Sequence, residues 1–321
     1  YDEVVKGTCI ALDNMKYNKT FWWRVTPVKG SKAESNDHEP SAAFKFTTAK
    51  TEAVSTTELS ALINKLGTGW RHAKEGNKPG TYKPGSIEML SNAVNEAEEV
   101  LYNPTAKMFT IKSVTSKLNE AINQFNNNYN YQVVDLGDWI ADKNAWSFKA
   151  NKHEDNLINV NMDVTGDSFV YTGAQLTANQ CLKFKTNLDF TNYEAFALNQ
   201  GTADQVFWAT TGYSIVIKRN IFEVQKRYYN TNGAFIGGIV KTYLNEESIM
   251  TSDRWYDVEM GLLSSPMGPR ILMKIDGKTV IDWVDTSDTP INERGYFGLQ
   301  DASGNAGLTL AGATYETNQE D

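Results

Sequence analysis

Residues 253–300 decide the fold of this chain. They contain the segments DRWYDVEMG (253–261), ILMKIDGKTVIDWVD (271–285) and RGYFGLQ (294–300). Apolar and polar residues alternate through these segments with the period of two that a β-strand imposes. Asp276 and Gly277 separate two alternating runs and form the sequence of a two-residue hairpin turn. The stretch therefore predicts consecutive antiparallel strands of a β-sandwich.

The same alternation predicts which side chains of this stretch face the core. Successive side chains of a strand point to opposite faces, so apolar positions two residues apart share one face. The residues expected in the core are Trp255, Val258, Met260, Ile271, Met273, Ile275, Val280, Val284, Phe297 and Leu299. The residues expected on outward faces are Asp257, Glu259, Lys274, Trp283, Tyr296 and Gln300.

Upstream of this stretch, strand-like segments follow one another from residue 131 onward. They include CLKFKTNLDF (181–190), YEAFALNQ (193–200), TGYSIVIKR (211–219) and NIFEVQKRYY (220–229). Turn signals such as Asn232-Gly233 recur at short intervals, and no long helical pattern interrupts them. We therefore predict one antiparallel β-sandwich over residues 131–316.

This region resembles a known group of modules. The strand WYDVE (255–259), the hairpin ILMKIDGKTV (271–280) and the strand GYFGLQ (295–300) look like those of concanavalin-like, or laminin-G-like, jelly-roll sandwiches. Such modules are attached to secreted bacterial polysaccharide-degrading enzymes. The resemblance implies carbohydrate binding in most members, catalysis in some, and a secreted or cell-surface location. Members often carry the sequence FALR, where this chain has Asn199 in place of the arginine.

The apolar period changes between residues 51 and 130. Apolar residues recur at helical spacing in the runs 59–66, 90–101 and 114–125, which predicts three helices. The loop GTYKPG (80–85) and the pair Asn103-Pro104 after the second run resemble the three-helix FIVAR module ("found in various architectures"). That resemblance implies a spacer or adhesive role. The polar run 126–130 is expected to be a linker.

Residues 1–50 read as strands. The segments DNMKYNKTFWWRV (13–25) and AFKFTT (43–48) resemble a turn with its strand and the last strand of a fibronectin type III domain, with Phe21 at the usual place of a tyrosine. Such a domain has about 100 residues, so we expect only its C-terminal part here, with its apolar face covered by another segment. Alternation is expected to make one of Trp22 and Trp23 a core residue and the other an exposed one.

Length and composition limit the functional classes. The 321 residues favour two or three modules. The net charge of -8 gives no general attraction for nucleic acid, and no apolar run approaches the roughly 20 residues of a membrane span. Cys9 and Cys181 lie far apart, which argues against a structural disulfide. Because the chain begins at Tyr1 without a signal peptide, we expect it to be a fragment of a longer product.

Catalytic and metal-binding motifs are weak in this sequence. Concanavalin-fold glycosidases need paired carboxylates, typically in an E-x-D-x-x-E strand, and this chain has only Asp257 and Glu259 on one face. The loop sequence DTSDTPINE (285–293) and the segment NVNMDVTGD (159–167) contain acidic and amide side chains that turns commonly use. A structural Ca²⁺ stays an expectation of the family resemblance, without assigned ligands.

The strongest functional indication is a polar strand face. If Phe222 and Val224 point into the core, then Glu223, Gln225 and Arg227 share the opposite face. Amides, carboxylates and arginine in a row match the hydroxyl groups of a sugar, and an aromatic side chain packs on its apolar face. The expected ligand-binding residues are Asn199, Glu223, Gln225, Arg227, Asp257, Glu259, Tyr296, Gln300, Trp208 and Tyr213.

These observations leave three functions open. The first is non-catalytic polysaccharide binding within a secreted polysaccharide-degrading enzyme, with other modules of the same polypeptide as partners. The second is a glycoside hydrolase or polysaccharide lyase with a divergent active site. The third is an architectural or adhesive spacer without a ligand.

Overall fold

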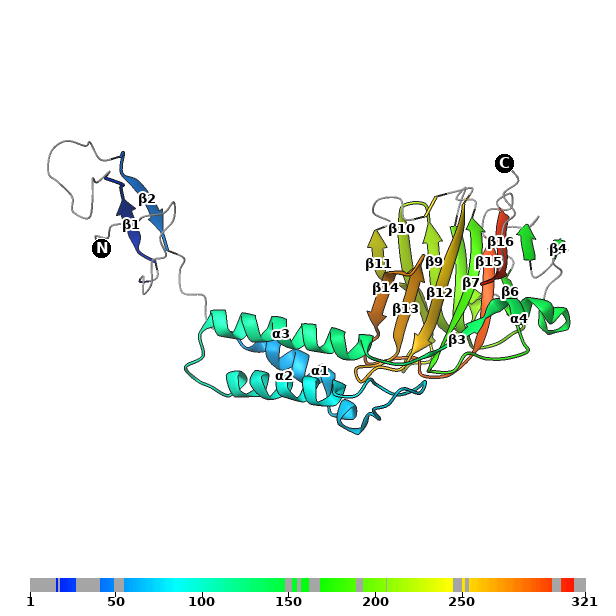
Figure 1. Ribbon diagram of the computed structural model, residues 1–321, viewed down its shortest axis with the longest axis horizontal. Coiled ribbons are helices and arrows are strands. Elements are labelled where there is room, and N and C mark those ends of the chain that lie inside the picture. Colours follow the sequence, from blue (N-terminus) through cyan, green and yellow to red (C-terminus); the bar gives the residue numbers. More distant parts are fainter. Residues whose placement is uncertain are drawn as a thin grey trace.

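Two β-sheets lie face to face and a helical segment extends from one end of them (Figure 1). The computed structural model describes residues 16, 18–26, 41–48, 55–147, 152–154, 157–161, 168–188, 193–205, 207–244, 250–251, 254–301 and 307–314. Within these residues, the antiparallel sandwich that the sequence predicts is confirmed, and a jelly-roll-like arrangement fits it.

The first sheet has six strands in the order β11-β10-β9-β8-β15-β6. Its strands are β6 (Ser168–Tyr171), β8 (Tyr193–Gln200), β9 (Gly212–Lys218), β10 (Ile221–Tyr229), β11 (Phe235–Leu244) and β15 (Tyr296–Asp301). The second sheet has eight strands, in the order β14-β13-β12-β7-β16-β5-β4 with β3 paired to β7. Its strands are β3 (Gln132–Asp135), β4 (Lys152–Glu154), β5 (Leu157–Asn161), β7 (Gln180–Leu188), β12 (Trp255–Leu263), β13 (Arg270–Ile275), β14 (Lys278–Val284) and β16 (Gly307–Gly312).

Four α-helices lie in the described residues, three of them where the sequence predicts helices. They are α1 (Thr57–Leu66), α2 (Ser86–Leu101), α3 (Met108–Asn127) and α4 (Leu136–Ala141). Three short 3₁₀ helices are η1 (Gly69–His72), η2 (Lys143–Ala145) and η3 (Phe207–Ala209). Among the helices described, none is long and apolar enough to cross a membrane.

The core of the sandwich lies between the two sheets and follows the predicted alternation. Val258, Met260, Ile271, Met273, Ile275, Phe297 and Leu299 are all buried in it, as the sequence predicts. Three aromatic rings, of Phe184, Phe196 and Phe297, meet at its centre from β7, β8 and β15. Burial of these apolar side chains supplies the main driving force for joining the sheets.

The assignments of Trp255 and Val284 to the core and of Trp283 to an outward face are wrong, because the phase of alternation differs from the expected one. Tyr256 shares the inward face with Val258, so Trp255 points outward with Asp257. In β14, a register shift opposite Met273 pairs Ile281 with Met273 and Trp283 with Ile271. Ile281 is therefore fully buried, and Trp283 packs against the core instead of facing outward. Val280 is partly buried and packs against the core, as expected, whereas Val284 is partly buried without belonging to the core.

The helical segment packs against outward-facing residues at one end of the eight-stranded sheet. Cys181, Leu263 and Leu272 belong to the same apolar cluster as the buried residues of α1, α2 and α3. At the C-terminus of α3, Arg270 donates hydrogen bonds to the carbonyl oxygen of Asn126 and, at 2.9 Å, to Asn127 Oδ1. The interpretation of 126–130 as a free polar linker is wrong, because Asn126 is buried and Tyr129 Oη donates to the carbonyl oxygen of Ala178 at 3.3 Å.

The N-terminal strands expose aromatic side chains. β1 (Thr20–Trp23) and β2 (Phe44–Thr47) form a two-stranded antiparallel sheet. Trp22 and Trp23 are 66% and 48% exposed, so neither is the core residue that alternation led us to expect. Trp23 stacks on Phe44, with 5.0 Å between ring centroids. Because a two-stranded hairpin is marginal in water, cover by a further segment stays a prediction. Cys9 lies outside the described residues.

Candidate ligand-binding face

The outer face of the six-stranded sheet, which points away from the other sheet, carries a row of polar side chains on β10. Glu223, Gln225 and Arg227 alternate with the core residues Phe222 and Val224. Successive side chains of a strand point to opposite faces, so the three polar side chains share the outer one. This part of the predicted arrangement is confirmed by the hydrogen bonds between the three.

These hydrogen bonds hold the row in one conformation. Gln225 Nε2 donates to Glu223 Oε2 at 2.9 Å, and Arg227 donates to Gln225 Oε1 at 2.6 Å. Arg227 also donates to Ser214 Oγ at 3.2 Å, and Lys218 Nζ donates to Glu223 Oε1 at 2.5 Å. Burial lowers the pKa of the Arg227 guanidinium from its ordinary value. A side chain that is already ordered loses little conformational entropy when a ligand binds.

Small residues lie beside this row and cross three neighbouring strands. Ser214 on β9 pairs with Ala197 on β8, and Ala197 pairs with Gly298 on β15. We call Ser214, Ala197 and Gly298 the small-residue strip. A Cβ atom on Gly298 would lie 2.7 Å from Gln200 Oε1 and 3.3 Å from Ala197 Cβ, so a side chain there would displace its neighbours. The strip forms a low floor between longer polar side chains.

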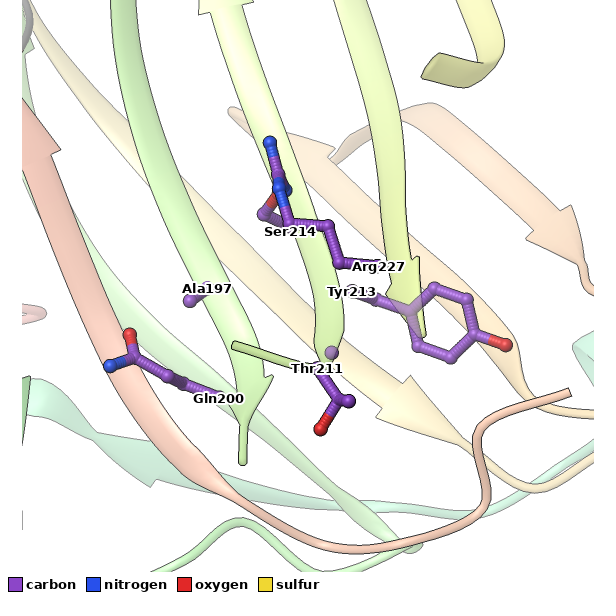
Figure 2. Close-up of a pocket in the computed structure, with 7 residues that line it drawn as sticks. Ala197, Gln200, Thr211, Tyr213, Ser214 and Arg227 are labelled. Atoms are coloured by element: carbon purple, nitrogen blue, oxygen red, sulfur yellow. The ribbon is translucent and has the colours of Figure 1, made fainter. Parts of the chain in front are cut away.

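A shallow hollow lies over part of this strip (Figure 2). Its lining residues are Ala197, Gln200, Thr211, Gly212, Tyr213, Ser214 and Arg227, and the space between them is too narrow to hold a water molecule. Pockets that enclose a small molecule usually have about 300–1,000 Å³. The hollow therefore cannot enclose a ligand, and a ligand would have to lie over it. Among the described residues that line it, none is a carboxylate or a histidine.

The side-chain oxygen of Gln200, which lines this hollow, receives no hydrogen bond from the described residues. The Gln200 side chain is 1% exposed, and its Nε2 donates to the carbonyl oxygens of Thr202 at 2.7 Å and Gln205 at 2.6 Å. Its Oε1 has no hydrogen-bond partner among the described residues. Leaving a buried acceptor unsatisfied costs about 1–3 kcal/mol, which a bound donor recovers.

Gln200 replaces Asn199 on this face, and the sequence did not indicate the exchange. A register shift between Tyr296 and Gly298 adds an extra residue to β8, so Gln200 pairs with Tyr296. Asn199 is buried and structural instead: its Oδ1 accepts from the backbone N–H of Tyr213 at 2.7 Å, and its Nδ2 donates to the carbonyl oxygen of Glu293 at 3.0 Å. Its assignment to the ligand-binding face is wrong.

Tyr213 is also part of the interior. Its side chain is 1% exposed. The Tyr213 hydroxyl donates a hydrogen bond to Asp285 Oδ2 at 2.5 Å, and the Tyr213 hydroxyl oxygen accepts one from the backbone N–H of Ile291 at 2.9 Å. Burial and the hydrogen bond to the Asp285 carboxylate raise the pKa of Tyr213. The expectation that this ring stacks on a sugar is therefore wrong.

Asp257 and Glu259 lie on the other sheet. Both belong to β12 and point outward as alternation predicts, but their outer face is that of the eight-stranded sheet. Glu259 accepts a hydrogen bond from Tyr131 Oη, and Lys274 Nζ lies 3.1 Å from Glu259 Oε1. Grouping these carboxylates with Glu223 is wrong, because strand parity gives a side of a sheet and does not give the sheet.

Gln300, Tyr296 and Trp208, the remaining residues predicted to bind the ligand, differ in how far they are exposed. Gln300 faces outward on β15 opposite Ala195, but it is 2% exposed and lies beneath the surface. Tyr296 is half-buried beside Gln200. Trp208, in η3, is 38% exposed and is not among the residues that line the hollow.

The acidic loop after β14 does not fit a calcium ion. Asp285 Oδ2 lies 2.6 Å from Lys226 Nζ, and Asp285 Oδ1 accepts from the backbone N–H of Ser287 at 3.0 Å. An ammonium group at this distance occupies the place a cation would take. Elsewhere in the described part of the chain, no group of three or more His, Cys, Asp or Glu side chains could hold a metal ion. Asp163 lies outside the described residues.

No protein-family model matches the chain, and no curated protein matches it in sequence. Solved structures give weak matches to about half of it. A protein of unknown function with a galectin-like fold from Bacillus subtilis is 9% identical, with a TM-score of 0.39, and the match covers 53% of this chain and 90% of that one.

Two further matches have similar values. A family 16 glycoside hydrolase of Bacteroides ovatus, solved with a mixed-linkage glucan product, is 12% identical with a TM-score of 0.33, covering 53% of this chain and 73% of that one. The galectin LEC-6 of Caenorhabditis elegans is 10% identical with a TM-score of 0.29, covering 53% of this chain and 97% of that one. At these scores the matches assign neither a family nor a function to this chain.

Proposed function

We propose that this chain binds a carbohydrate chain, without cleaving it, on the outer face of the six-stranded sheet. The observation that carries the proposal is the unpartnered Oε1 of Gln200 in a hollow that Arg227 also lines. A sugar hydroxyl both donates and accepts hydrogen bonds, so neighbouring hydroxyls can satisfy Gln200 Oε1 and accept from Arg227. A peptide or lipid offers fewer groups of this kind at such spacing.

The shape of the face supports a chain that lies across the strands. The small-residue strip runs from β9 over β8 to β15, perpendicular to the strand direction. The polar row on β10 stands at one end of the strip, where Gln225 pairs with Ser214. A sugar chain would lie over these small residues, and the fixed polar atoms at their margin would supply its orientation.

The chemistry of the hollow favours binding over catalysis. Glycoside hydrolysis needs two carboxylates about 5 to 10 Å apart. On β10, Glu223 is held by Lys218 and Gln225, and the residues that line the hollow supply no second carboxylate. The hydrolase or lyase alternative is tested by the same experiment as binding.

The place of this face within a larger protein is part of the proposal. We infer a binding region of a secreted or cell-surface bacterial enzyme that degrades polysaccharides, with residues 51–130 as a FIVAR-like spacer and residues 1–50 as a fibronectin-like part. The helical segment contacts the eight-stranded sheet at Cys181, Leu263 and Leu272, and no described residue of the six-stranded sheet belongs to that apolar cluster.

Replacing Arg227 with alanine should weaken glycan binding by roughly 10- to 150-fold, because a hydrogen bond from a charged group contributes about 1.5–3 kcal/mol. Affinity electrophoresis on a panel of polysaccharides, followed by calorimetry on those that retard the protein, measures the change. Lys241→Ala is the matched control, since Lys241 is an exposed cation on β11 of the same sheet.

Three outcomes separate the alternatives. A polysaccharide that binds the parent and Arg227→Ala equally well places the site elsewhere. Release of reducing ends or unsaturated products shows an enzyme. No retention by any polysaccharide of the panel favours the spacer. Glu223→Ala is a poorer test than Arg227→Ala, because Glu223 is buried and bonded to Lys218 and Gln225, so its loss also affects stability.

A further inference from the structure

Two buried glutamine side chains on the outer face of the six-stranded sheet have unsatisfied oxygens. Gln200 and Gln300 are 1% and 2% exposed, and the Oε1 of each has no hydrogen-bond partner among the described residues. Buried polar atoms are nearly always paired, so two on one face call for an explanation.

The two side chains stand on either side of the small-residue strip. Gln200 pairs with Tyr296, Ala197 pairs with Gly298, and Gln300 pairs with Ala195, in that order along β15 and β8. The strip position formed by Ala197 and Gly298 is therefore flanked on both sides by a glutamine. Gln200 Oε1 is directed toward Gly298, since a Cβ atom there would lie 2.7 Å from it.

The orientation of the Gln200 amide is fixed by the protein. Its Nε2 donates to two backbone carbonyl oxygens, of Thr202 and Gln205. Turning the amide over would place Oε1 against those two acceptors, which is unfavourable. Gln200 therefore offers the strip an oxygen that can only accept a hydrogen bond.

We propose that this face selects sugar units whose hydroxyl groups above Gly298 are unsubstituted. The Oε1 atoms of Gln200 and Gln300 would accept hydrogen bonds from those hydroxyl groups. This inference rests on the proposed carbohydrate binding. An O-acetyl or O-methyl group removes the donor and leaves the buried oxygens unpaired. A site built to pair with a hydroxyl rejects an analogue that lacks one far more strongly than an apolar pocket does.

The absence of a side chain at Gly298 adds a steric requirement. A methyl group at this position would meet Gln200 Oε1 at 2.7 Å and Ala197 Cβ at 3.3 Å. Gln200 Oε1 and the Ala197 methyl group already fill the space above Gly298, so a substituent on a ligand unit finds no room there. The selected ligand is therefore a linear polysaccharide that is unbranched and unacylated at this unit.

The first test compares matched polymers. Glucomannan, xylan and homogalacturonan, each in its O-acetylated and alkali-deacetylated form, are measured by affinity electrophoresis with the full chain. For the polymer that binds, the deacetylated form should bind roughly 10- to 150-fold more tightly, the range expected when a buried acceptor loses its donor. Equal binding of both forms overturns the inference.

The second test uses Gln300→Leu, in which stability and affinity should move in different directions. Removing a buried oxygen without a partner should leave the melting temperature unchanged or raise it, because the folded state no longer holds an unsatisfied acceptor. Binding of the deacetylated polymer should fall, and the ratio between the two forms should become smaller, because only Gln200 then accepts from a ligand hydroxyl. A variant that keeps the full ratio shows that acetyl bulk alone is responsible, which also overturns the inference.

The third test fills the strip. Gly298→Ala should reduce binding of the deacetylated polymer by about 10-fold or more, and Gly238→Ala is its control, because a Cβ atom at Gly238 on β11 meets nothing within 4 Å. Equal binding by Gly298→Ala and the parent would contradict a ligand over the strip. If no polymer binds the parent, the proposed function itself fails. If Arg227→Ala abolishes binding while acetylation has no effect, only the hydroxyl inference fails.

Discussion

Replacing Asp285 with alanine should lower the free energy of unfolding by about 3–5 kcal/mol, because it leaves a buried ammonium group without its counter-ion. Lys226 and Asp285 are 3% and 2% exposed, and Lys226 Nζ lies 2.6 Å from Asp285 Oδ2. Lys226 also donates to Ser287 Oγ at 2.9 Å and Thr289 Oγ1 at 3.3 Å. The pair thereby fastens the loop after β14 to β10 of the facing sheet. Urea unfolding of the full chain measures the loss.

Two controls distinguish the buried pair from a surface one. Glu96→Ala removes a pair of the same 2.6 Å separation whose side chains are 57% and 46% exposed, and should cost at most about 1 kcal/mol. The double variant Lys226→Met with Asp285→Leu should recover most of the loss, since two apolar side chains need no counter-ion. A loss for Asp285→Ala no larger than that for Glu96→Ala would show that the pair contributes little.

The pair of Lys226 and Asp285 should make the stability of the fold depend on pH in the acidic range. Burial by itself raises the pKa of Asp285, but hydrogen bonds from Lys226, Ser287 and Tyr213 outweigh burial and hold the pKa below its ordinary value. A carboxyl group with a lowered folded-state pKa stabilises the fold above its unfolded pKa of about 3.9, and this stabilisation is lost as the pH falls through the folded-state value. The difference in melting temperature between the parent and Asp285→Ala should be constant above about pH 5 and shrink below about pH 4. A difference that grows in acid contradicts this assignment.

Replacing Arg270 with alanine should lower the free energy of unfolding by about 1.5–3 kcal/mol, the contribution of hydrogen bonds from a charged group, and should loosen the helical segment from the sandwich. Arg270 is 3% exposed, and its Nε and Nη2 donate to the two carboxylate oxygens of Asp282 at 2.6 and 2.7 Å. It also donates to the carbonyl oxygen of Asn126 at the end of α3. The last carbonyl groups of a helix carry partial negative charge without partners of their own, so a buried guanidinium there is favourable.

Proteolysis and a matched ion pair test this role of Arg270. In the parent, residues 126–131 should resist cleavage because they are packed against the eight-stranded sheet, whereas Arg270→Ala should be cut there. Arg254→Ala is the control: its side chain is 60% exposed and lies 2.6 Å from Asp276, so its removal should cost at most about 1 kcal/mol. Rapid cleavage of the parent at 126–131 would show that the helices and the sandwich behave independently, as the polar sequence alone suggested.

The β-sandwich could be predicted from the sequence because apolar and polar residues alternate strongly through residues 253–300. The turn residues Asp276 and Gly277 lie between two of the alternating runs. In a strand with one face in the core, every second side chain points to that face. This rule predicted the burial of Val258, Met260, Ile271 and Met273, and all four are buried. The helices α1, α2 and α3 were equally visible, because a helix repeats at 3.6 residues and proline and glycine mark its ends. The modular boundaries at residues 50 and 130 stay predictions.

The candidate site was only partly visible in the sequence. Alternation placed Glu223, Gln225 and Arg227 on one face, and their hydrogen bonds follow from that placement. It could not reveal that a bulge exchanges Asn199 for Gln200, because an extra residue changes the phase without leaving a mark in composition. It could not separate Glu259 from Glu223 either, since the order of strands in a sheet depends on contacts between distant segments.

The sequence by itself therefore determined the period of each segment, and with it the strands, the helices and the side of each side chain. Only the tertiary structure decided which strands are neighbours, at which end of the sandwich the helices pack, and where buried polar atoms find partners. Lys226 illustrates the difference: a lysine among core positions of β10 has no explanation in its own strand, and Asp285 reaches it from the loop after β14. The physical reason is that local periodicity is set by backbone geometry within a few residues, whereas pairing of sheets and charges depends on contacts that only the folded chain brings together.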